Sequence, residues 1–190
     1  MTVGILALQG AFREHDQMLQ RIGVATQFVR QPKHLEVVDR LIIPGGESTT
    51  IGTLMVIDHL LEPIRERASA GMPLWGTCAG AILMATAIAE GRPAGQPALA
   101  LMQITARRNA FGSQLDSFEV DLPMPALGAQ PLHSVFIRAP ILEEPGPAVD
   151  VLATLPTGQI VAARQGNLLA TCFHPELTND ERLHRYFLAL

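Results

Sequence analysis

The chain has 190 residues, a formal net charge of −4 and 48% hydrophobic residues. The hydrophobic share is too high for a disordered chain, and the length suits one compact domain over residues 1–190. No cluster of Lys and Arg stands out, so nucleic-acid binding lacks an electrostatic basis, and no apolar run is long enough to span a membrane.

The first half of the sequence alternates short apolar runs with amphipathic stretches. The run at Val3–Leu8 is typical of a parallel strand buried on both faces. Further strands are predicted at Thr26–Val29, Leu41–Ile43 and Pro73–Trp75, and helices at Ala11–Ile22, Ser48–Ile57, Leu61–Ala70 and Ala79–Ala89. This alternation predicts a mainly parallel central sheet with helices on both faces.

The second half is dominated by strands, and their close spacing indicates antiparallel strands added to the parallel sheet. They are predicted at Leu101–Arg107, Gln114–Val120, His133–Ile137, Val149–Ala153, Gln159–Ala163 and Leu168–Cys172. A last helix is expected from Asn179 to the end. The predicted fold class is therefore α/β, with three layers and a mixed but mainly parallel sheet.

The two cysteines, Cys78 and Cys172, lie far apart in apolar surroundings. A chain of this length needs no disulfide, and its N-terminus lacks the basic start and cleavage site of a signal peptide. We therefore expect a reducing, cytoplasmic compartment. Cys172 ends a strand and is expected in the core.

Cys78 is the first candidate for chemistry, in the motif Gly76-Thr77-Cys78-Ala79-Gly80. The motif follows a predicted strand and opens a predicted helix, which is the setting of a nucleophile elbow. Flanking glycines let the backbone pass closely, and a helix N-terminus favours a thiolate. Alone, the motif fits a buried structural thiol about as well.

The second candidate is the pair His174 and Glu176, which directly follows the last predicted strand. A cysteine nucleophile needs a base, and the base needs a carboxylate to orient it. An isolated His-Pro-Glu is more often a surface turn. Beside Cys78, at the same edge of a parallel sheet, the catalytic interpretation is favoured.

Two glycine turns also follow strands: Gln9-Gly10, and the run Pro44-Gly45-Gly46-Glu47-Ser48-Thr49-Thr50. Ser48 or Thr49 is expected to cap the following helix, and the exposed amides can hold a carboxylate or an oxyanion. A phosphate loop is the rival interpretation, but the Walker lysine is missing. A plain strand–helix turn remains the simpler alternative.

Arginines stand at two further strand ends, Arg107-Arg108 and Arg138, and a guanidinium can bind an α-carboxylate bidentately. By themselves these arginines are more often surface salt-bridge residues. The remaining histidines, His15, His34, His59, His133 and His184, lack metal-ligand spacing, so no metal is expected.

Together and in this order, these motifs resemble the class I, triad-type glutamine amidotransferases. Among them, the chain is similar to the glutaminase subunits of pyridoxal 5′-phosphate synthases. The resemblance covers essentially the whole length. It rests on Leu8-Gln9-Gly10, Arg13-Glu14-His15, Pro44–Thr50, Gly76–Gly80, Arg108-Asn109, Phe111-Gly112, Phe118-Glu119, Val135–Pro140 and His174–Thr178.

The resemblance implies a role for each matching residue. Cys78 would be the nucleophile, His174 the general base and Glu176 the residue that orients it. Glutamine would bind to Gly46, Glu47, Ser48, Arg108, Ile137 and Arg138, and the oxyanion hole would involve Gln9, Gly10, Gly46 and Ala79. It also implies no cofactor, and its implied partner, which takes the ammonia, is a barrel-shaped pyridoxal 5′-phosphate synthase subunit.

Three alternatives remain open. One is a non-catalytic binding module on the same fold, against which the joint presence of Cys78, His174 and Glu176 argues. Another is a cysteine hydrolase or chaperone with a similar elbow, which would not need the late His-x-Glu. The third is a glutaminase subunit serving a different ammonia acceptor.

Overall fold

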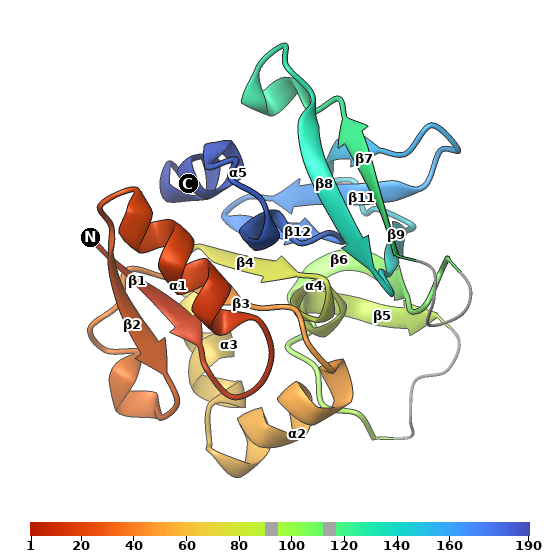
Figure 1. Ribbon diagram of the computed structural model, residues 1–190. Coiled ribbons are helices and arrows are strands. Elements are labelled where there is room, and N and C mark those ends of the chain that lie inside the picture. Colours follow the sequence, from red (N-terminus) through yellow and green to blue (C-terminus); the bar gives the residue numbers. More distant parts are fainter. Residues whose placement is uncertain (90–94, 112–116) are drawn as a thin grey trace.

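The computed structural model describes residues 1–89, 95–111 and 117–190 (Figure 1). Its strands are β1 (Thr2–Leu6), β2 (Ala25–Val29), β3 (Arg40–Ile43), β4 (Leu74–Thr77), β5 (Ala85–Ala89), β6 (Met102–Arg107), β7 (Ser117–Leu122), β8 (Leu132–Ile137), β9 (Ile141–Glu143), β10 (Asp150–Thr154), β11 (Ile160–Gln165) and β12 (Leu168–Thr171). Its α-helices are α1 (Phe12–Arg21), α2 (Ser48–Ile57), α3 (Leu61–Ser69), α4 (Ala79–Met84) and α5 (Arg182–Leu188), with short 3₁₀ turns η1 (Pro32–His34), η2 (Pro125–Leu127) and η3 (Pro175–Leu177).

The central sheet has the order β2-β1-β3-β4-β12-β11-β9-β6-β5, with β10 paired to β11, over the described residues. The first five strands of this order pair in parallel, as do β5 and β6. Strands β9, β10 and β11 add the antiparallel pairs. The predicted fold class, a mainly parallel sheet with added antiparallel strands, is confirmed.

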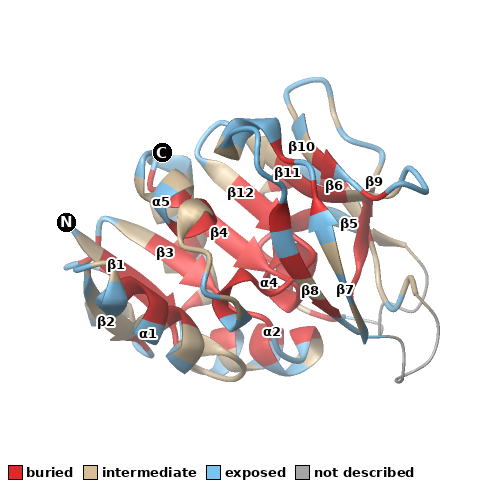
Figure 2. Ribbon diagram, turned by 45° about the horizontal axis from the view of Figure 1, so that its top comes forward, coloured by how far each residue is buried: buried red, intermediate tan, exposed pale blue. Residues whose placement is uncertain are grey.

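Helices cover both faces of the sheet because side chains along each strand alternate between the two faces. In β3 and β4, Ile42 and Trp75 join the core with α1 and α5. Their neighbours Leu41 and Leu74 point to the other face, into the core with α2 and α3. Figure 2 shows the central strands buried between these layers.

The predicted helix Ala79–Ala89 is wrong in its second half. Helix α4 ends at Met84, and Ala85 already has the extended ψ of 140°. Residues Ala85–Ala89 form β5, which pairs in parallel with β6. Thr86 and Ile88 are β-branched, and sheet pairing outweighs the helix preference of Ala85, Ala87 and Ala89.

Other differences concern the second half of the chain. β7 and β8 pair only with each other among the described residues and form a separate two-stranded sheet. The predicted strand Gln114–Val120 begins outside the described residues. Its described part corresponds to β7. The short β9 was not predicted, because three residues after Pro140 show no usable periodicity. The last helix begins at Arg182 and not at Asn179.

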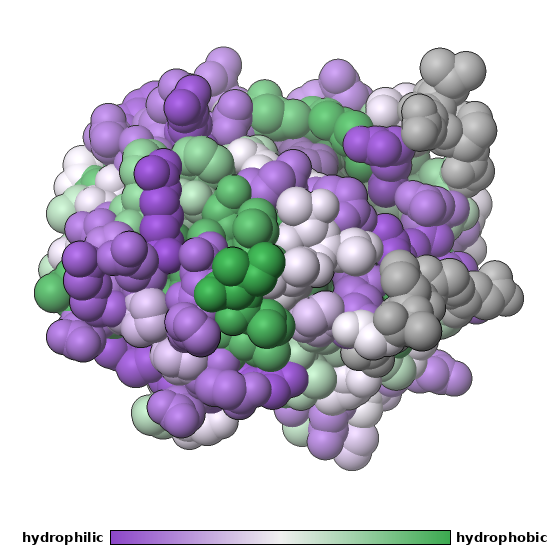
Figure 3. All heavy atoms as spheres, turned by 90° about the horizontal axis from the view of Figure 1, so that it is seen from below, coloured by the Kyte–Doolittle hydropathy of each residue, from purple (hydrophilic) through white to green (hydrophobic). Residues whose placement is uncertain are grey.

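The surface seen from below carries an apolar patch (Figure 3). Val56 and Ile57, at the end of α2, are exposed large hydrophobic residues. No helix in the described part of the chain has the length and apolar character needed to cross a membrane.

Candidate active site

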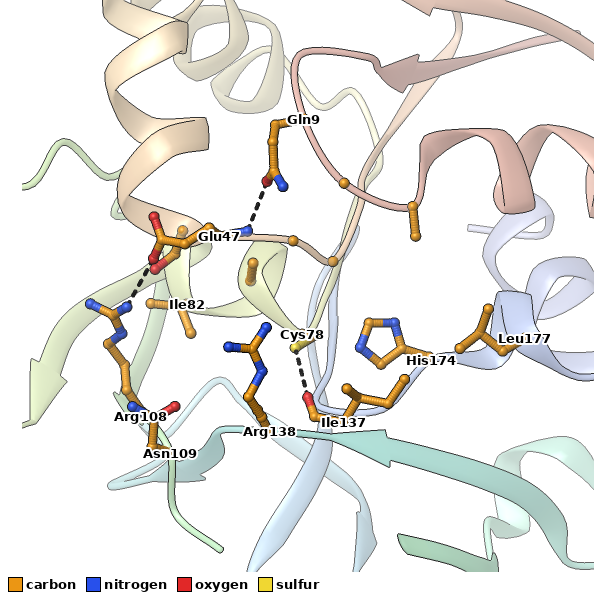
Figure 4. A pocket seen from close by; sticks show the side chains of 16 residues that line it. Gln9, Glu47, Cys78, Ile82, Arg108, Asn109, Ile137, Arg138, His174 and Leu177 are labelled. Atoms are coloured by element: carbon orange, nitrogen blue, oxygen red, sulfur yellow. Dashed lines mark hydrogen bonds and ion pairs between the residues drawn. The ribbon is translucent and has the colours of Figure 1, made fainter. Parts of the chain in front are cut away.

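The carboxyl ends of β1, β3, β4 and β12 meet at one edge of the sheet, and the four motifs that follow them line one cavity of about 340 Å³ (Figure 4). A cavity of this size accommodates an amino-acid substrate. Its lining residues are Gln9, Gly10, Ala11, Gly45, Gly46, Glu47, Ser48, Cys78, Ala79, Ile82, Arg108, Asn109, Ile137, Arg138, His174 and Leu177. The structure thus brings together all the residues to which the resemblance assigns a role except Glu176, which lies behind His174.

Cys78 sits on a strained turn between β4 and α4, with φ 48° and ψ −102°. Its amide donates to the carbonyl of Thr171 at 2.8 Å, and its Sγ lies 4.0 Å from the carbonyl oxygen of Ile137. A Cβ on Gly76 or Gly80 would overlap backbone atoms of Gly80 or Ile43. The turn therefore requires both flanking glycines, and it holds a buried thiol at the N-terminus of α4.

His174 faces Cys78 from the segment after β12. Its backbone amide donates to Val135 at 2.8 Å, and its Nδ1 lies 2.7 Å from Oε1 of Glu176. Burial lowers the pKa of His174, but the hydrogen bonds with Cys78 and Glu176 outweigh that effect and raise it to about 10. The ring is therefore held as an imidazolium beside the sulfur.

Glu176 lies on η3 and its side chain is fully buried. Burial alone would raise the pKa of this carboxyl, but nearby His15 and the hydrogen bond from His174 lower it overall. The carboxylate form is therefore the one this site stabilises. Only its Oε1 has a hydrogen-bond partner, while Oε2 lies 3.5 Å from Nε2 of His15.

The two glycine turns pack against each other beside the cysteine. The amide of Ala11 donates to Gly45 at 2.9 Å, and the amide of Glu47 donates to Oε1 of Gln9 at 2.8 Å. Gly10 has φ +102°, and a Cβ there would overlap the Gly45 carbonyl. These contacts fix the backbone around Gly46, whose amide lies between two loop amides that already have partners.

The cap of α2 differs from the prediction. The capping residue is Glu47, whose Oε2 accepts from the amide of Thr50 at 2.7 Å, and not Ser48 or Thr49. Ser48 is instead buried, and its Oγ accepts from Gln96 Nε2 at 3.2 Å. Burial raises the pKa of Glu47, but hydrogen bonds from the amides of Thr50 and Thr49 and the charge of Arg108 lower it overall. The loop therefore carries a negative charge.

Two guanidinium groups enter the cavity from the opposite side. Arg108 Nη2 lies 3.0 Å from Oε1 of Glu47, and its Nη1 donates to Oε1 of Gln96 at 3.4 Å. Arg138 has φ +45° and points into the cavity between Arg108 and Cys78 (Figure 4). A carboxylate bound here would meet both cations.

Sequence reasoning missed several residues around the cavity. Gln96 contacts both Ser48 and Arg108 but lies in a Gly/Pro-rich connector that carries no functional signal. Thr77 belongs to the elbow motif, yet its role in accepting the Gly45 amide at 2.9 Å cannot be read from the motif. Within the described residues, no three His, Cys, Asp or Glu side chains are grouped to hold a metal ion.

Replacing Gly45 with alanine is expected to lower turnover about a hundredfold, because the added Cβ would overlap Cε1 of His174 and lie 3.3 Å from Cβ of Cys78. His174 cannot retreat, since both its backbone and its ring are held. The overpacking should also cost about 1–3 kcal/mol of unfolding free energy. Steady-state kinetics and thermal unfolding measure the two effects.

Gly158→Ala is the matched control for this variant. A Cβ at Gly158 meets no atom within 4 Å, but its φ of +92° strains any side chain. This variant should lose stability and keep turnover. Full activity of Gly45→Ala would show that the ring of His174 has more freedom than the packing indicates.

The α/β fold, the cysteine elbow with its His–carboxylate pair, and the paired glycine turns form the arrangement expected of a glutamine amidotransferase of the triad type. Comparison with known proteins agrees. Residues 5–190 match the SNO glutamine amidotransferase family, and the chain belongs to that family. The family predicted from the sequence is thereby confirmed.

Curated relatives match over the full length of both chains. The chain is 68% identical to the pyridoxal 5′-phosphate synthase subunit PdxT of Roseiflexus castenholzii and 67% identical to that of Herpetosiphon aurantiacus, each over 100% of both chains. A solved structure described as a glutamine amidotransferase shares 50% identity and a TM-score of 0.91, covering 98% of this chain and 97% of that one. A chain of the PurLQS structure from Thermotoga maritima shares the fold alone, at 15% identity and a TM-score of 0.70 over 99% of this chain and 97% of that one.

Proposed function

We propose that this amidotransferase hydrolyses L-glutamine to L-glutamate and ammonia, with Cys78 as nucleophile, His174 as acid and base, and Glu176 as the residue that orients His174. The observation that carries the proposal is the geometry of the three groups. The thiol stands on an elbow, the imidazole faces it, and the carboxylate holds Nδ1 of that imidazole at 2.7 Å. This is the general arrangement of a triad.

In the first step, the thiolate of Cys78 attacks the side-chain amide carbon of glutamine. A carbon–sulfur bond forms and the carbonyl oxygen takes the negative charge. The amides of Ala79 and Gly46 stabilise this oxyanion, helped by the contacts of Gln9 and Gly10 that fix the loop. A donor of this kind contributes about 3–4 kcal/mol in known cases.

In the second step, His174 donates its proton to the leaving nitrogen. The carbon–nitrogen bond breaks, and ammonia departs from a glutamyl thioester. His174, now neutral, takes a proton from a water molecule, whose oxygen attacks the thioester carbonyl. The carbon–sulfur bond then breaks, which releases glutamate and restores the thiolate–imidazolium pair.

The α-groups of glutamine are recognised at the far end of the cavity. Arg108 and Arg138 supply positive charge for the α-carboxylate, and Glu47 supplies negative charge for the α-ammonium. Gly46 and Ser48 shape the loop beneath the substrate, and Ile137 lines the opposite wall. The charges oppose one another in the way a zwitterionic amino acid requires.

The named relatives support a specific acceptor for the ammonia. Because they are subunits of pyridoxal 5′-phosphate synthase, we propose that residues 1–190 act as one cytoplasmic domain that docks on a barrel-shaped synthase subunit. That partner would consume the ammonia in vitamin B6 biosynthesis. A different acceptor would leave glutamine hydrolysis unchanged but would not yield pyridoxal 5′-phosphate.

The test is glutamate release from glutamine with and without a cognate synthase subunit, with asparagine as the control substrate. We expect release from glutamine, faster with the synthase, and pyridoxal 5′-phosphate when its sugar phosphates are present. No glutamate under either condition, from folded protein, would overturn the glutaminase assignment. Glutamate without pyridoxal 5′-phosphate would overturn only the acceptor.

Cys78 is expected to be alkylated by iodoacetamide much faster than Cys172. Cys78 lines the cavity, and the hydrogen bonds with Cys78 and Glu176 raise the pKa of His174 to about 10, so an imidazolium stands beside the reacting sulfur. Cys172 lies in the core, out of reach of the reagent.

Mass spectrometry of the labelled peptide separates Cys78 from Cys172. The thiol of Cys172 is fully buried, and burial raises its pKa well above the usual value, so it should stay unlabelled. Equal labelling of the two thiols would argue against an accessible nucleophile at Cys78.

A further inference from the structure

A buried polar cluster lies behind the proposed triad, on the side away from the cavity. It consists of His15 on α1, Thr77 on β4, Glu176 on η3 and His184 on α5. His15, Thr77 and His184 are fully buried and Glu176 is 6% exposed. The rings of His15 and His184 pack edge to face against Trp75. Burying polar groups costs free energy unless they are paired by hydrogen bonds, so the partners of these four side chains are expected to be specific.

His15 stands at the branch point of the cluster. Its Nε2 lies 3.3 Å from Oγ1 of Thr77 and 3.5 Å from Oε2 of Glu176. Its Nδ1 lies 3.1 Å from Nε2 of His184. One branch therefore reaches the carboxylate that holds His174. The other branch reaches the turn Gly45–Glu47, here called the glycine loop, because Oγ1 of Thr77 accepts a hydrogen bond from the amide of Gly45.

The positions of the protons follow from these contacts. Burial lowers the pKa of His15, which leaves it neutral with one N–H. The groups that face it are Glu176, His174 and Glu14, together with His184 at its other nitrogen. If Nε2 were bare, its lone pair would face the carboxylate of Glu176. The hydrogen therefore belongs on Nε2, where it points between Oε2 of Glu176 and Thr77.

His184 completes this assignment. With the hydrogen of His15 on Nε2, Nδ1 of His15 is an acceptor and takes the N–H of His184 Nε2. The remaining nitrogen of His184, Nδ1, has no hydrogen-bond partner. A bare lone pair there costs less than an unpaired N–H would. The opposite set of tautomers would leave that N–H unpaired and repel Glu176 as well.

We propose that His15 is a positioning residue for the proposed glutaminase reaction. It holds Oε2 of Glu176 directly and the glycine loop through Thr77, and so fixes the two relative to each other. The inference rests on the proposed function. Neither contact touches the substrate. His15 fixes the orientation of the Glu176 carboxylate, which in turn orients His174. Through Thr77 it also fixes the position of the loop that carries the Gly46 amide. One side chain thus aligns the acid–base pair with the oxyanion site.

The test compares two amide substitutions that each keep one hydrogen-bonding position of the imidazole. In His15→Gln the amide NH₂ group takes the place of the Nε2–H donor, and in His15→Asn the amide oxygen takes the place of the Nδ1 acceptor. We expect His15→Gln to keep kcat within about threefold and His15→Asn to lose about ten- to a hundredfold, with little change in KM for glutamine. Equal losses in both, or a better His15→Asn, would overturn the proposal.

The pH profile gives a readout that loss of packing would not move. The hydrogen on Nε2 of His15 faces Oε2 of Glu176 at an N–O distance of 3.5 Å, and a donor in that position favours the carboxylate over the neutral acid. Without the Nε2 hydrogen, the pKa of Glu176 rises and the carboxylate is neutralised at higher pH. The acidic limb of kcat should therefore shift upward in His15→Asn and stay in place in His15→Gln. An unchanged limb in both would contradict the assignment.

Phe187→Leu is the packing control, because Phe187 is buried against Trp75 and makes no polar contact with the triad. It should lower the melting temperature and leave the pH profile unchanged. Alkylation of Cys78 by iodoacetamide provides a measurement that needs no turnover. Wild-type protein without glutaminase activity would overturn the proposed function, while the pH profile of alkylation in the two His15 variants would still decide the role of His15.

Discussion

Replacing Cys78 with alanine is expected to lower kcat for glutamine hydrolysis by about 10⁵-fold or more, to background. The methyl group cannot form the carbon–sulfur bond on which both half-reactions depend. The fold should survive, because Cys78 is 7% exposed and its turn is held by backbone contacts, such as its amide to Thr171, that alanine retains. Glutamate release in the presence of the synthase measures the loss.

Cys172→Ala is the matched control, since it removes the other thiol of the chain. Cys172 is fully buried in the core, as expected from the sequence, and its Sγ lines no part of the cavity. That variant should lose stability, by about 1 kcal/mol for a small buried group, and keep kcat. Measurable turnover by purified Cys78→Ala would show that another group attacks the amide.

Much of this site could be predicted because its residues follow strands. Cys78, His174 and the glycine loop each come directly after a buried apolar run. The carboxyl ends of parallel strands share one edge, so short motifs distant in sequence converge without any knowledge of the loops between them. The fold class rested on the same alternation of apolar runs and amphipathic stretches.

The parts that sequence reasoning missed depend on contacts between distant segments. Residues 85–89 have a helix-compatible composition and become a strand only because β6 lies beside them. Gln96 carries no local signal. His15 stands in one of the motifs of the family resemblance, but its role could not be predicted, because both residues acquire their partners from elements far along the chain. The helix cap at Glu47 was missed for a related reason. Ser and Thr are the commoner caps, but here Ser48 is engaged by Gln96.

Replacing Glu176 with glutamine is expected to lower kcat by about 10³–10⁴-fold while leaving KM for glutamine nearly unchanged. The amide oxygen can still accept from Nδ1 of His174, but it carries no charge to stabilise the imidazolium. The pKa of His174 falls when that carboxylate is lost, because Glu176 raises it through both a hydrogen bond and its charge. The thiolate of Cys78 then loses its counter-ion.

Burial makes this substitution worse than it would be at a surface. Oε2 of Glu176 lies 3.5 Å from Nε2 of His15, so the glutamine amide would place an NH₂ group where an acceptor is required. Turning the amide over would bring the same NH₂ against Nδ1–H of His174. Either orientation leaves two donors facing each other at a buried side chain, which adds about 1–3 kcal/mol of destabilisation.

Glu47→Gln separates the effect of charge at the catalytic pair from charge elsewhere in the same cavity. Glu47 pairs with Arg108 at 3.0 Å, is partly exposed, and does not contact His174. Its loss should raise KM, because the α-ammonium loses its partner, and leave kcat within a few-fold. Initial rates over a range of glutamine concentrations resolve the two patterns. If Glu176→Gln behaved like Glu47→Gln, the carboxylate behind His174 would be a structural group, and the reaction would proceed with His174 and Cys78 alone.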